Sequence, residues 1–197
     1  MRNFLLIIGL LFFTSNIFAN EQQKLQDIFV QKLDEVTITV SDKGLSKQDR
    51  NTLVVKVLEP IFDFEIMAKL SLDKKWGDLS QEDKIKFVEV YVERMKQSYS
   101  SKLDEYSGEK FKVVSLEQPK SNRILLNTSI VSTEKKFDLK YKFYKPKSQK
   151  ENENDWLIYD VEILGVSILK TDRAQFKEFL QTRSVNDLMT ELAKSNS

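Results

Sequence analysis

The stretch KKFDLKYKFYK, residues 135–145, decides the fold class because apolar side chains occupy every second position over most of it. Successive side chains of a β-strand point to opposite faces, so this spacing predicts a strand with one apolar and one charged face. The apolar face would meet either the protein's own core or a bound apolar molecule. Its four side chains are Phe137, Leu139, Tyr141 and Phe143.

Three other segments share this two-residue period and would pair with residues 135–145 in one sheet. The turns between neighbouring segments are short and polar or contain Gly or Pro, which favours an antiparallel meander. The longest connection, residues 146–155, is rich in charged residues and predicts a solvated hairpin loop. The three segments are residues 110–118, 123–132 and 155–164.

Helical periodicity fills the chain before the strands. Apolar residues recur at helical spacing in residues 25–36 and 62–72. Ser46 and Ser80 each stand three residues before an aspartate, which is typical of a helix start. The helix after Ser80 has the clearest apolar stripe, which runs through residues 85–106 and contains several aromatic side chains.

The order of elements is therefore helices, four strands and helices. Two short C-terminal helices are predicted, one around Phe176 and one after Ser184. This order predicts an α+β fold in which several helices pack on one face of a curled antiparallel four-stranded sheet. The fold is expected to be NTF2-like or cystatin-like, with an apolar cavity between the sheet and the helices.

The first 19 residues have the pattern of a secretory signal peptide. Arg2 supplies a positive charge, residues 4–13 are uncharged and apolar, and the small residue Ala19 precedes a polar stretch. The apolar run is short of the roughly 20 residues that a membrane-spanning helix needs, and an uncleaved N-terminal anchor is the alternative. We expect cleavage after about Ala19 and a single domain at residues 20–197, whose lipid-binding role rests on the family resemblance described below. Export without cysteines suits a bacterial periplasm.

Composition excludes several classes of function. The sequence contains no histidine and no cysteine, so it cannot build Ser-His or Cys-His triads or a zinc site of the usual ligands. Lys and Arg number 31 against 30 Asp and Glu, and this neutral balance gives no indication of nucleic-acid binding. Only five glycines occur, and the sequence has no Gly-rich phosphate-binding loop.

Several segments, in this order, resemble the MlaC family, which is also called the toluene-tolerance auxiliary family. The segments are FDFEIMAKLSLDKKW at residues 62–76, YSG at 106–108 and WLIYDVEILGVS at 156–167. The resemblance covers essentially the whole chain, the predicted signal included. The chain departs from the family pattern in two places, since Asp73 stands where a glycine is usual and residues 171–172 are Thr-Asp where Asn-Tyr is common.

Members of this family are periplasmic phospholipid-binding proteins of the pathway that maintains outer-membrane lipid asymmetry. The resemblance implies a monomeric, non-enzymatic carrier without a cofactor, which holds a phospholipid's acyl chains between sheet and helices and exposes the headgroup. Its partners would be an inner-membrane ABC transporter complex with a substrate-binding domain and an outer-membrane lipoprotein–porin complex. Residues 135–145 would form one cavity wall and the helix at residues 85–106 another. The predicted lipid-binding residues are Phe64, Met67, Phe87, Tyr91, Met95, Tyr99, Tyr106, Val113, Phe137, Leu139, Tyr141, Phe143, Tyr159, Val161, Ile163, Val166 and Phe176.

Two alternatives stand beside the carrier. In an acid–base enzyme, Asp160 would act with Tyr159 or Tyr141 in an apolar site. Because Tyr159 and Asp160 are neighbours on a predicted strand, we expect them on opposite faces of the sheet. As structural residues, Asp160 would be a paired acid and Asp63 a helix cap. The other alternative is a protein-interaction module without a small ligand, which would use the sheet edge or residues 146–155.

Overall fold

The computed structural model describes the backbone of residues 4–103, 109–131, 136–147 and 155–194. Side chains are described for the same residues except 4–19 and 98–103. The predicted YSG segment and most of the predicted hairpin loop lie outside the described residues. Within them, the predicted α+β class is confirmed, because one antiparallel sheet combines with helices that precede and follow it.

The sheet is an antiparallel meander in which each strand pairs with the next. The sequence predicts four strands, and the structure adds a fifth of two residues. This strand forms because Leu164 and Gly165 have positive φ angles of 51° and 81°, which turn the chain back within two residues. The strands are β1 Lys110–Lys120, β2 Arg123–Val131, β3 Lys136–Tyr144, β4 Leu157–Ile163 and β5 Val166–Ser167.

The predicted helix starts are present. Ser46 and Ser80 each accept a hydrogen bond from the backbone N–H three residues later, at 3.1 Å in both cases, and Ser184 does the same. Asp63 accepts a hydrogen bond from the Ile66 N–H at 2.9 Å, which confirms it as a helix cap. The helices are α1 Phe4–Ser41, α2 Lys47–Leu58, α3 Phe64–Leu72, α4 Gln81–Leu103, α5 Ile168–Phe179 and α6 Val185–Lys194, with the 3-10 turns η1 Glu59–Ile61 and η2 Asp73–Asp78.

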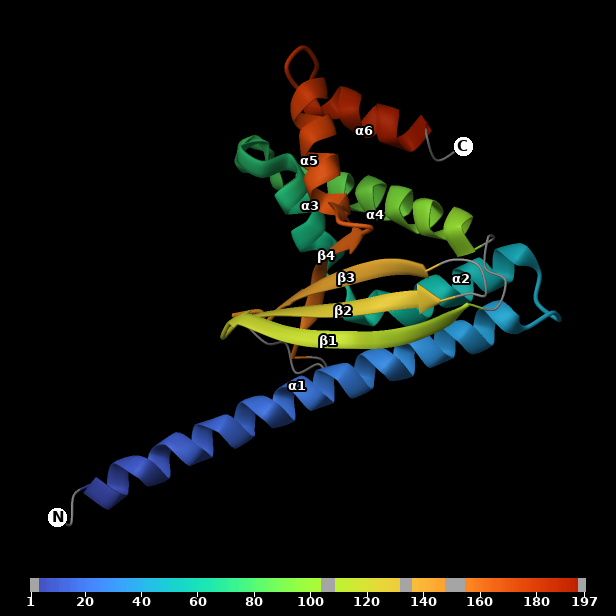
Figure 1. The fold of residues 1–197 in the computed structure, drawn as a ribbon. Coiled ribbons are helices and arrows are strands. Elements are labelled where there is room, and N and C mark those ends of the chain that lie inside the picture. Colours follow the sequence, from blue (N-terminus) through green and yellow to red (C-terminus); the bar gives the residue numbers. More distant parts are fainter. Residues whose placement is uncertain (1–3, 104–108, 132–135, 148–154, 195–197) are drawn as a thin grey trace.

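α1 is one continuous helix that also includes most of the predicted signal segment. After residue 20 it presents an apolar face to the sheet, while its C-terminal part packs on α2 (Figure 1). In the described part of the chain, no helix is both long enough and apolar enough to cross a membrane. The contact between α1 and α2 is made by Val36, Val40 and Val54, with Val57 and Leu58 beside them.

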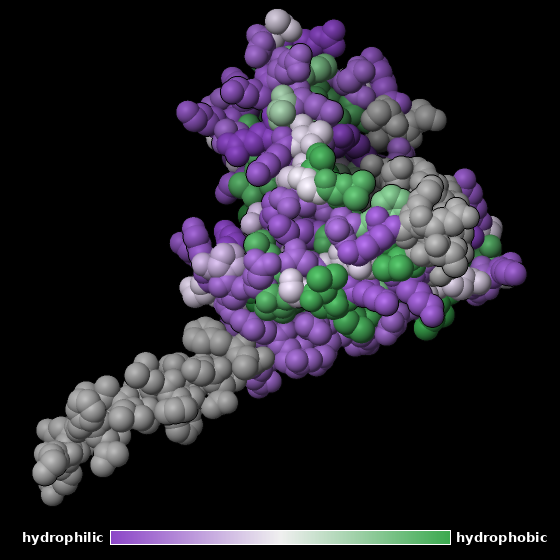
Figure 2. Space-filling view, in the orientation of Figure 1, coloured by the Kyte–Doolittle hydropathy of each residue, from purple (hydrophilic) through white to green (hydrophobic). Residues whose placement is uncertain are grey.

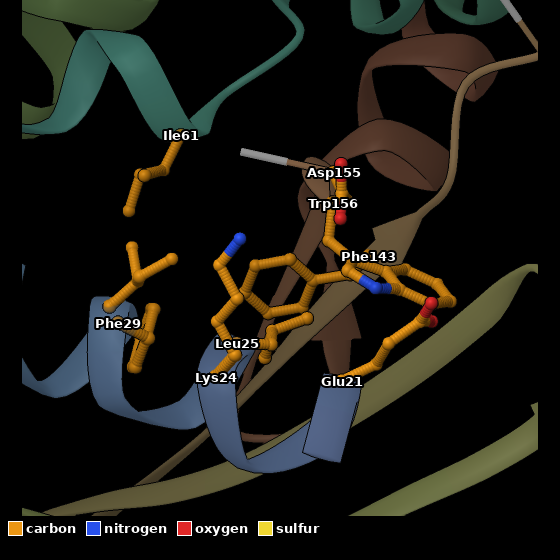
Figure 3. A pocket seen from close by; sticks show the side chains of 9 residues that line it. Glu21, Lys24, Leu25, Phe29, Ile61, Phe143, Asp155 and Trp156 are labelled. Atoms are coloured by element: carbon orange, nitrogen blue, oxygen red, sulfur yellow. The ribbon is translucent and has the colours of Figure 1, made fainter. Parts of the chain in front are cut away.

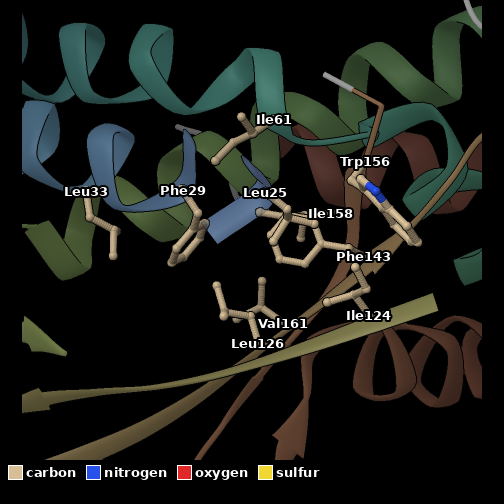
Figure 4. Close-up of a cluster of buried hydrophobic side chains, with 10 residues drawn as sticks. All are labelled: Leu25, Phe29, Leu33, Ile61, Ile124, Leu126, Phe143, Trp156, Ile158 and Val161. Carbon is tan, nitrogen blue, oxygen red and sulfur yellow. The ribbon is translucent and has the colours of Figure 1, made fainter. Parts of the chain in front are cut away.

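One apolar core, which we call the sheet cluster, joins α1 to the inner face of the sheet. Figure 4 shows Leu25, Phe29 and Leu33 pointing from α1 toward the strands. The Phe29 ring meets Tyr141 and Phe143 edge-on, with ring centroids 4.6 and 5.9 Å apart. The alternating face of β3 is therefore an inner face, as predicted. The sheet cluster consists of Leu25, Phe29, Leu33, Ile61, Ile124, Leu126, Phe143, Trp156, Ile158 and Val161.

A second core, which we call the helical cluster, lies among α3, α4, α5 and α6 beside β4 and β5 (Figure 1). α4 turns its most buried side chains toward these helices, whereas the sequence analysis expected them opposite β3. An apolar stripe predicts that one helix face is buried but does not predict which element covers it. The helical cluster consists of Met67, Ala68, Leu72, Phe87, Tyr91, Met95, Phe176, Leu188, Met189 and Leu192.

Tyr159 and Asp160 lie on the same face of the sheet, so their predicted opposite orientation is wrong. A β-bulge is the cause, because Lys142 pairs with Asp160 whereas the next residue, Phe143, pairs with Ile158. Tyr159 is therefore an extra residue in β4, and the alternation of faces shifts by one position there. Both side chains point away from the sheet cluster.

Candidate functional site

A cavity of about 30 Å³ lies between α1 and the sheet. Its floor is apolar and comes from α1, η1 and the sheet, whereas its rim carries charged side chains (Figure 3). The helical period explains this division, because Leu25 and Phe29 face the sheet while Lys24 stays at the edge of the same face. The apolar lining residues are Leu25, Ile28, Phe29, Ile61, Phe143 and Trp156, and the rim residues are Glu21, Lys24 and Asp155.

Two polar contacts hold α1 over this end of the sheet. The Lys145 ammonium lies 3.0 Å from the Glu21 carboxylate and 5.9 Å from the centre of the Trp156 ring. Gln22 donates a hydrogen bond to the Gln118 side-chain oxygen at 2.6 Å. The Glu21 and Lys145 side chains are about one-third exposed, at 32% and 31%, so this ion pair is weak. The attachment of α1 to the sheet is therefore mainly apolar.

Tyr141 lies beside the cavity, with its ring against Phe29. Burial alone raises the pKa of its hydroxyl well above the ordinary value, with no charged or hydrogen-bonded neighbour contributing. The hydroxyl consequently stays neutral over the whole physiological range. Tyr141 therefore offers a wide, nearly apolar wall between α1 and β3.

The cavity has room for about one water molecule, far less than an acyl chain needs. An apolar space thus lies between the sheet and α1 as predicted, but in the described part of the chain it is not the acyl-chain-sized cavity that was expected, because the side chains of α1 fill most of it. The surface in Figure 2 is mostly hydrophilic, with apolar side chains in separate small groups. On the face in that view, no broad apolar area in the described part of the chain could shelter an acyl chain instead.

A larger groove of about 640 Å³ lies between α2 and α4, but its lining is polar. Among the described residues that line it, Val55 is the one apolar residue, so these residues offer an acyl chain few apolar contacts in place of water. The lining residues are Lys47, Gln48, Asn51, Thr52, Val55, Glu93, Lys96 and Gln97.

Asp160 is fully engaged on the outer face of the sheet. Its carboxylate accepts hydrogen bonds from the Lys142 ammonium at 2.8 Å, the Ser167 hydroxyl at 2.7 Å and the Leu169 N–H at 3.1 Å. Although burial lowers the pKa of Lys142, its hydrogen bonds to Asp160 and Glu162 hold that pKa above the ordinary value. Asp160 thus ties two strands to the start of α5, which confirms the paired structural acid.

The predicted lipid-binding residues divide between the two clusters. The structure brings four of them together at the sheet cluster, two as members and two packed against it, and these are Val113, Tyr141, Phe143 and Val161. It places six others in or against the helical cluster, and these are Phe64, Met67, Phe87, Tyr91, Met95 and Phe176.

The remaining predicted residues lie outside both groups. Leu139 is buried on the inner face of β3. Phe137, Ile163 and Val166 are 36%, 38% and 60% exposed. Tyr159 packs on Tyr144 and Arg123 on the outer face. The side chains of Tyr99 and Tyr106 lie outside the described residues.

Comparison with known protein families bears on the whole chain after the predicted signal. The family model described as "MlaC protein" matches residues 21–194. The chain belongs to the MlaC family. The resemblance noted in residues 62–76 and 156–167 is thereby confirmed.

Two known proteins are similar to this MlaC family member. The intermembrane phospholipid transport system binding protein MlaC of Haemophilus influenzae is 26% identical over 155 residues, which cover 77% of this chain and 72% of that protein. A phospholipid-binding protein from Ralstonia solanacearum, solved in complex with a phospholipid, matches with a TM-score of 0.74 and 18% identity. That match covers 89% of this chain and 96% of the solved one, and it supports the fold.

Most of the cavity lining of this MlaC family member was not predicted from its sequence. Leu25, Ile28 and Phe29 were predicted as the apolar face of a helix but not as part of a site. Their strict helical spacing, directly after a predicted cleavage point, was the available signal. Ile61 and Trp156 reach the cavity only through tertiary packing, which no local pattern reveals.

Proposed function

We propose that this protein is a phospholipid carrier that holds acyl chains between α1 and the sheet and performs no bond-making step. The observation that carries the proposal is the apolar seam formed by Leu25, Phe29 and Leu33 against the inner face of the sheet. Membership of a family with a phospholipid transport relative, and a fold shared with a protein solved with a phospholipid, support it.

A carrier is needed because acyl chains are insoluble in water. Burial of one methylene contributes about 0.8 kcal/mol, so an acyl chain of about sixteen carbons costs on the order of 12 kcal/mol to expose. A protein can offset this cost only by replacing hydrocarbon contacts with its own apolar side chains. Phe29, Tyr141 and Phe143 supply large surfaces for that exchange.

Loading requires α1 to move away from the sheet, since the closed cavity holds only about 30 Å³. The C-terminal part of α1 has its own anchor on α2 at Val36 and Val54, so the part with Leu25 and Phe29 would swing outward. When a lipid enters, α1 and the sheet would exchange their contacts with each other for contacts with the acyl chains. Apolar contacts are not directional, so this exchange needs no exact alignment of the groups. We propose Val113, Tyr141, Phe143 and Val161 as lipid contacts, while lipid contact by the other predicted residues stays a prediction.

The proposed carrier acts as a monomer in the periplasm after signal cleavage following about Ala19. It would exchange lipid with an outer-membrane lipoprotein–porin complex and with an inner-membrane ABC transporter complex that has a substrate-binding domain, and so maintain lipid asymmetry. The polar rim, with Glu21, Lys24 and Asp155, would leave the headgroup accessible to these partners.

The test is to express the full chain with its N-terminal segment in bacteria, purify the exported protein, and analyse an organic extract by mass spectrometry. The proposal predicts a mass that corresponds to cleavage near Ala19 and about one phospholipid per protein. Exported, folded protein that yields no phospholipid, and that takes up none from vesicles, would contradict the carrier function.

A further inference from the structure

Trp156 carries a buried hydrogen-bond donor that lacks an acceptor. The residue is only 6% exposed and lines the cavity, and its Nε1–H has no hydrogen-bond partner among the described residues. A buried donor left unsatisfied is unfavourable, because it has lost its hydrogen bonds to water without replacement. Phe143 and Leu25, which line the same cavity, cannot accept a hydrogen bond. Because Nε1 itself has almost no accessible surface in this structure, it becomes available as a donor to a ligand only when α1 moves away from the sheet.

Lys24 carries a second donor at the rim of the same cavity. Its side chain extends from α1 beside the Phe143 ring (Figure 3). Lys24 is exposed, and no ion pair is found for it in the described part of the chain. The neighbouring carboxylate of Glu21 is instead paired with Lys145. The two donors thus differ in depth, with the indole N–H buried and the ammonium in solvent.

This order of depth corresponds to the anatomy of a phospholipid, in which the ester carbonyls lie just above the acyl chains and the phosphate lies further out. We propose that Trp156 donates a hydrogen bond to an acyl ester carbonyl of the bound lipid and that Lys24 contacts its phosphodiester. The inference rests on the proposed carrier function and assigns the polar part of the same site. It makes the site selective for diacyl phospholipids over other molecules with acyl or alkyl chains.

The indole contact is tested by comparing a diacyl phospholipid with a dialkyl-ether phospholipid, which has the same chains and headgroup but no carbonyl. We expect the full-length mature protein to bind the diacyl lipid about fivefold more tightly, which corresponds to one hydrogen bond. Trp156→Phe keeps an aromatic ring but has no N–H, so this variant should bind the diacyl and the dialkyl-ether lipid with equal affinity. Trp76→Phe, which changes the tryptophan near the helical cluster, should leave the preference for the diacyl lipid unchanged.

The lysine contact is tested by comparing the diacyl phospholipid with diacylglycerol, which lacks the phosphate. Lys24→Gln should lower affinity for the phospholipid about fivefold and leave that for diacylglycerol unchanged. Lys43→Gln, an exposed lysine after the far end of α1, is the matched control.

The outcomes separate the two proposals. A wild-type protein that binds neither phospholipid would overturn the carrier function together with this inference. A wild-type protein that binds both with equal affinity, or a Trp156→Phe variant that keeps the wild-type ratio, would overturn the indole contact alone. An unchanged phospholipid affinity in Lys24→Gln would remove the phosphate contact.

Discussion

The sheet cluster and the helical cluster bury similar side chains but hold them in different ways. In the helical cluster, the Tyr91 hydroxyl donates to Asp172 at 2.8 Å, and the other carboxylate oxygen of Asp172 pairs with Arg94 at 2.9 Å. The rings of Phe87, Tyr91 and Phe176 pack on one another at 6.0–6.3 Å. In the sheet cluster, Trp156 has no hydrogen-bond acceptor within the described residues and a cavity lies beside it.

The difference indicates which part of the protein can change its contacts. A buried hydrogen-bonded network fixes one arrangement, because any displacement leaves polar groups unsatisfied. An apolar seam has no such directional requirement, and α1 can exchange the sheet for another apolar surface at small cost. We therefore expect the helical cluster to stay intact while α1 opens.

The largest predicted effect comes from fixing α1 to the sheet. In a Gln22→Cys/Gln118→Cys double variant, a short bis-maleimide linker would join two side chains that are hydrogen-bonded in the closed structure. Because the chain has no other cysteine, the linker reacts only there. We expect the linked protein to lose phospholipid uptake from vesicles, measured with a fluorescent lipid, while the unlinked variant loads normally.

The matched control places the same linker outside the sheet cluster. The Lys96 ammonium of α4 lies 3.8 Å from the Glu59 carboxylate of η1. A Glu59→Cys/Lys96→Cys variant can therefore be linked in the same way. The protein linked at these two positions should take up phospholipid as the unlinked protein does. Equal loading of both linked proteins would mean that α1 does not move during uptake.

Truncation of Phe176 tests the helical cluster. This ring is 3% exposed and contacts both Phe87 and Tyr91. We expect Phe176→Ala to lower the free energy of unfolding by about 4 kcal/mol, as for other buried phenylalanines. Urea denaturation should show the same loss with and without phospholipid, because the proposed lipid position does not include this site. A larger lipid-induced gain in the variant than in the wild type would contradict the division between clusters.

The equivalent truncation in the sheet cluster should respond to lipid. Phe29 is 2% exposed, and Phe29→Ala should cost the empty protein about 3 kcal/mol. Bound acyl chains can fill the vacated space, so phospholipid should stabilise this variant by about 1 kcal/mol more than it stabilises the wild type. Urea denaturation with and without lipid measures the difference, and an equal gain in both proteins would place the lipid elsewhere.

The smallest effect concerns backbone strain beside the helical cluster. Asp73 has a φ of 51°, a backbone conformation that favours glycine, and its side chain pairs with Arg173. A hydrogen bond from Arg173 lowers the pKa of the Asp73 carboxyl. Because both side chains are half-exposed, the ion pair contributes little. Asp73→Gly should raise the urea midpoint by about half a molar through relief of strain, without changing lipid uptake. A lower midpoint would show that the Arg173 contact dominates.

Local patterns predicted the elements well because their causes are local. Ser46, Ser80 and Asp63 cap helices as expected, since a cap depends on residues only three positions apart. The alternation in residues 135–145 correctly predicted the inner face of β3, although Phe137 at its end is exposed.

The packing of the elements against one another could not be predicted from local patterns. The stripe on α4 identified Phe87 and Tyr91 as buried, but only packing of the complete chain assigns them to the helices rather than to the sheet. The bulge at Tyr159 shifts the alternation by one residue, and the sequence around it still reads as a regular strand. The position of the cavity could not be predicted, because Trp156 and Ile61 are far in sequence from the α1 residues that they meet there.

The most direct test of where the lipid lies uses a phospholipid with a photoreactive diazirine in one acyl chain. After loading and irradiation of the wild-type mature protein, mass spectrometry of the peptides identifies the labelled residues. We predict labels on α1 around Phe29 and on β3 around Tyr141 and Phe143. Labels concentrated around Phe87, Tyr91 and Phe176 would contradict the account, because the lipid would then occupy the helical cluster.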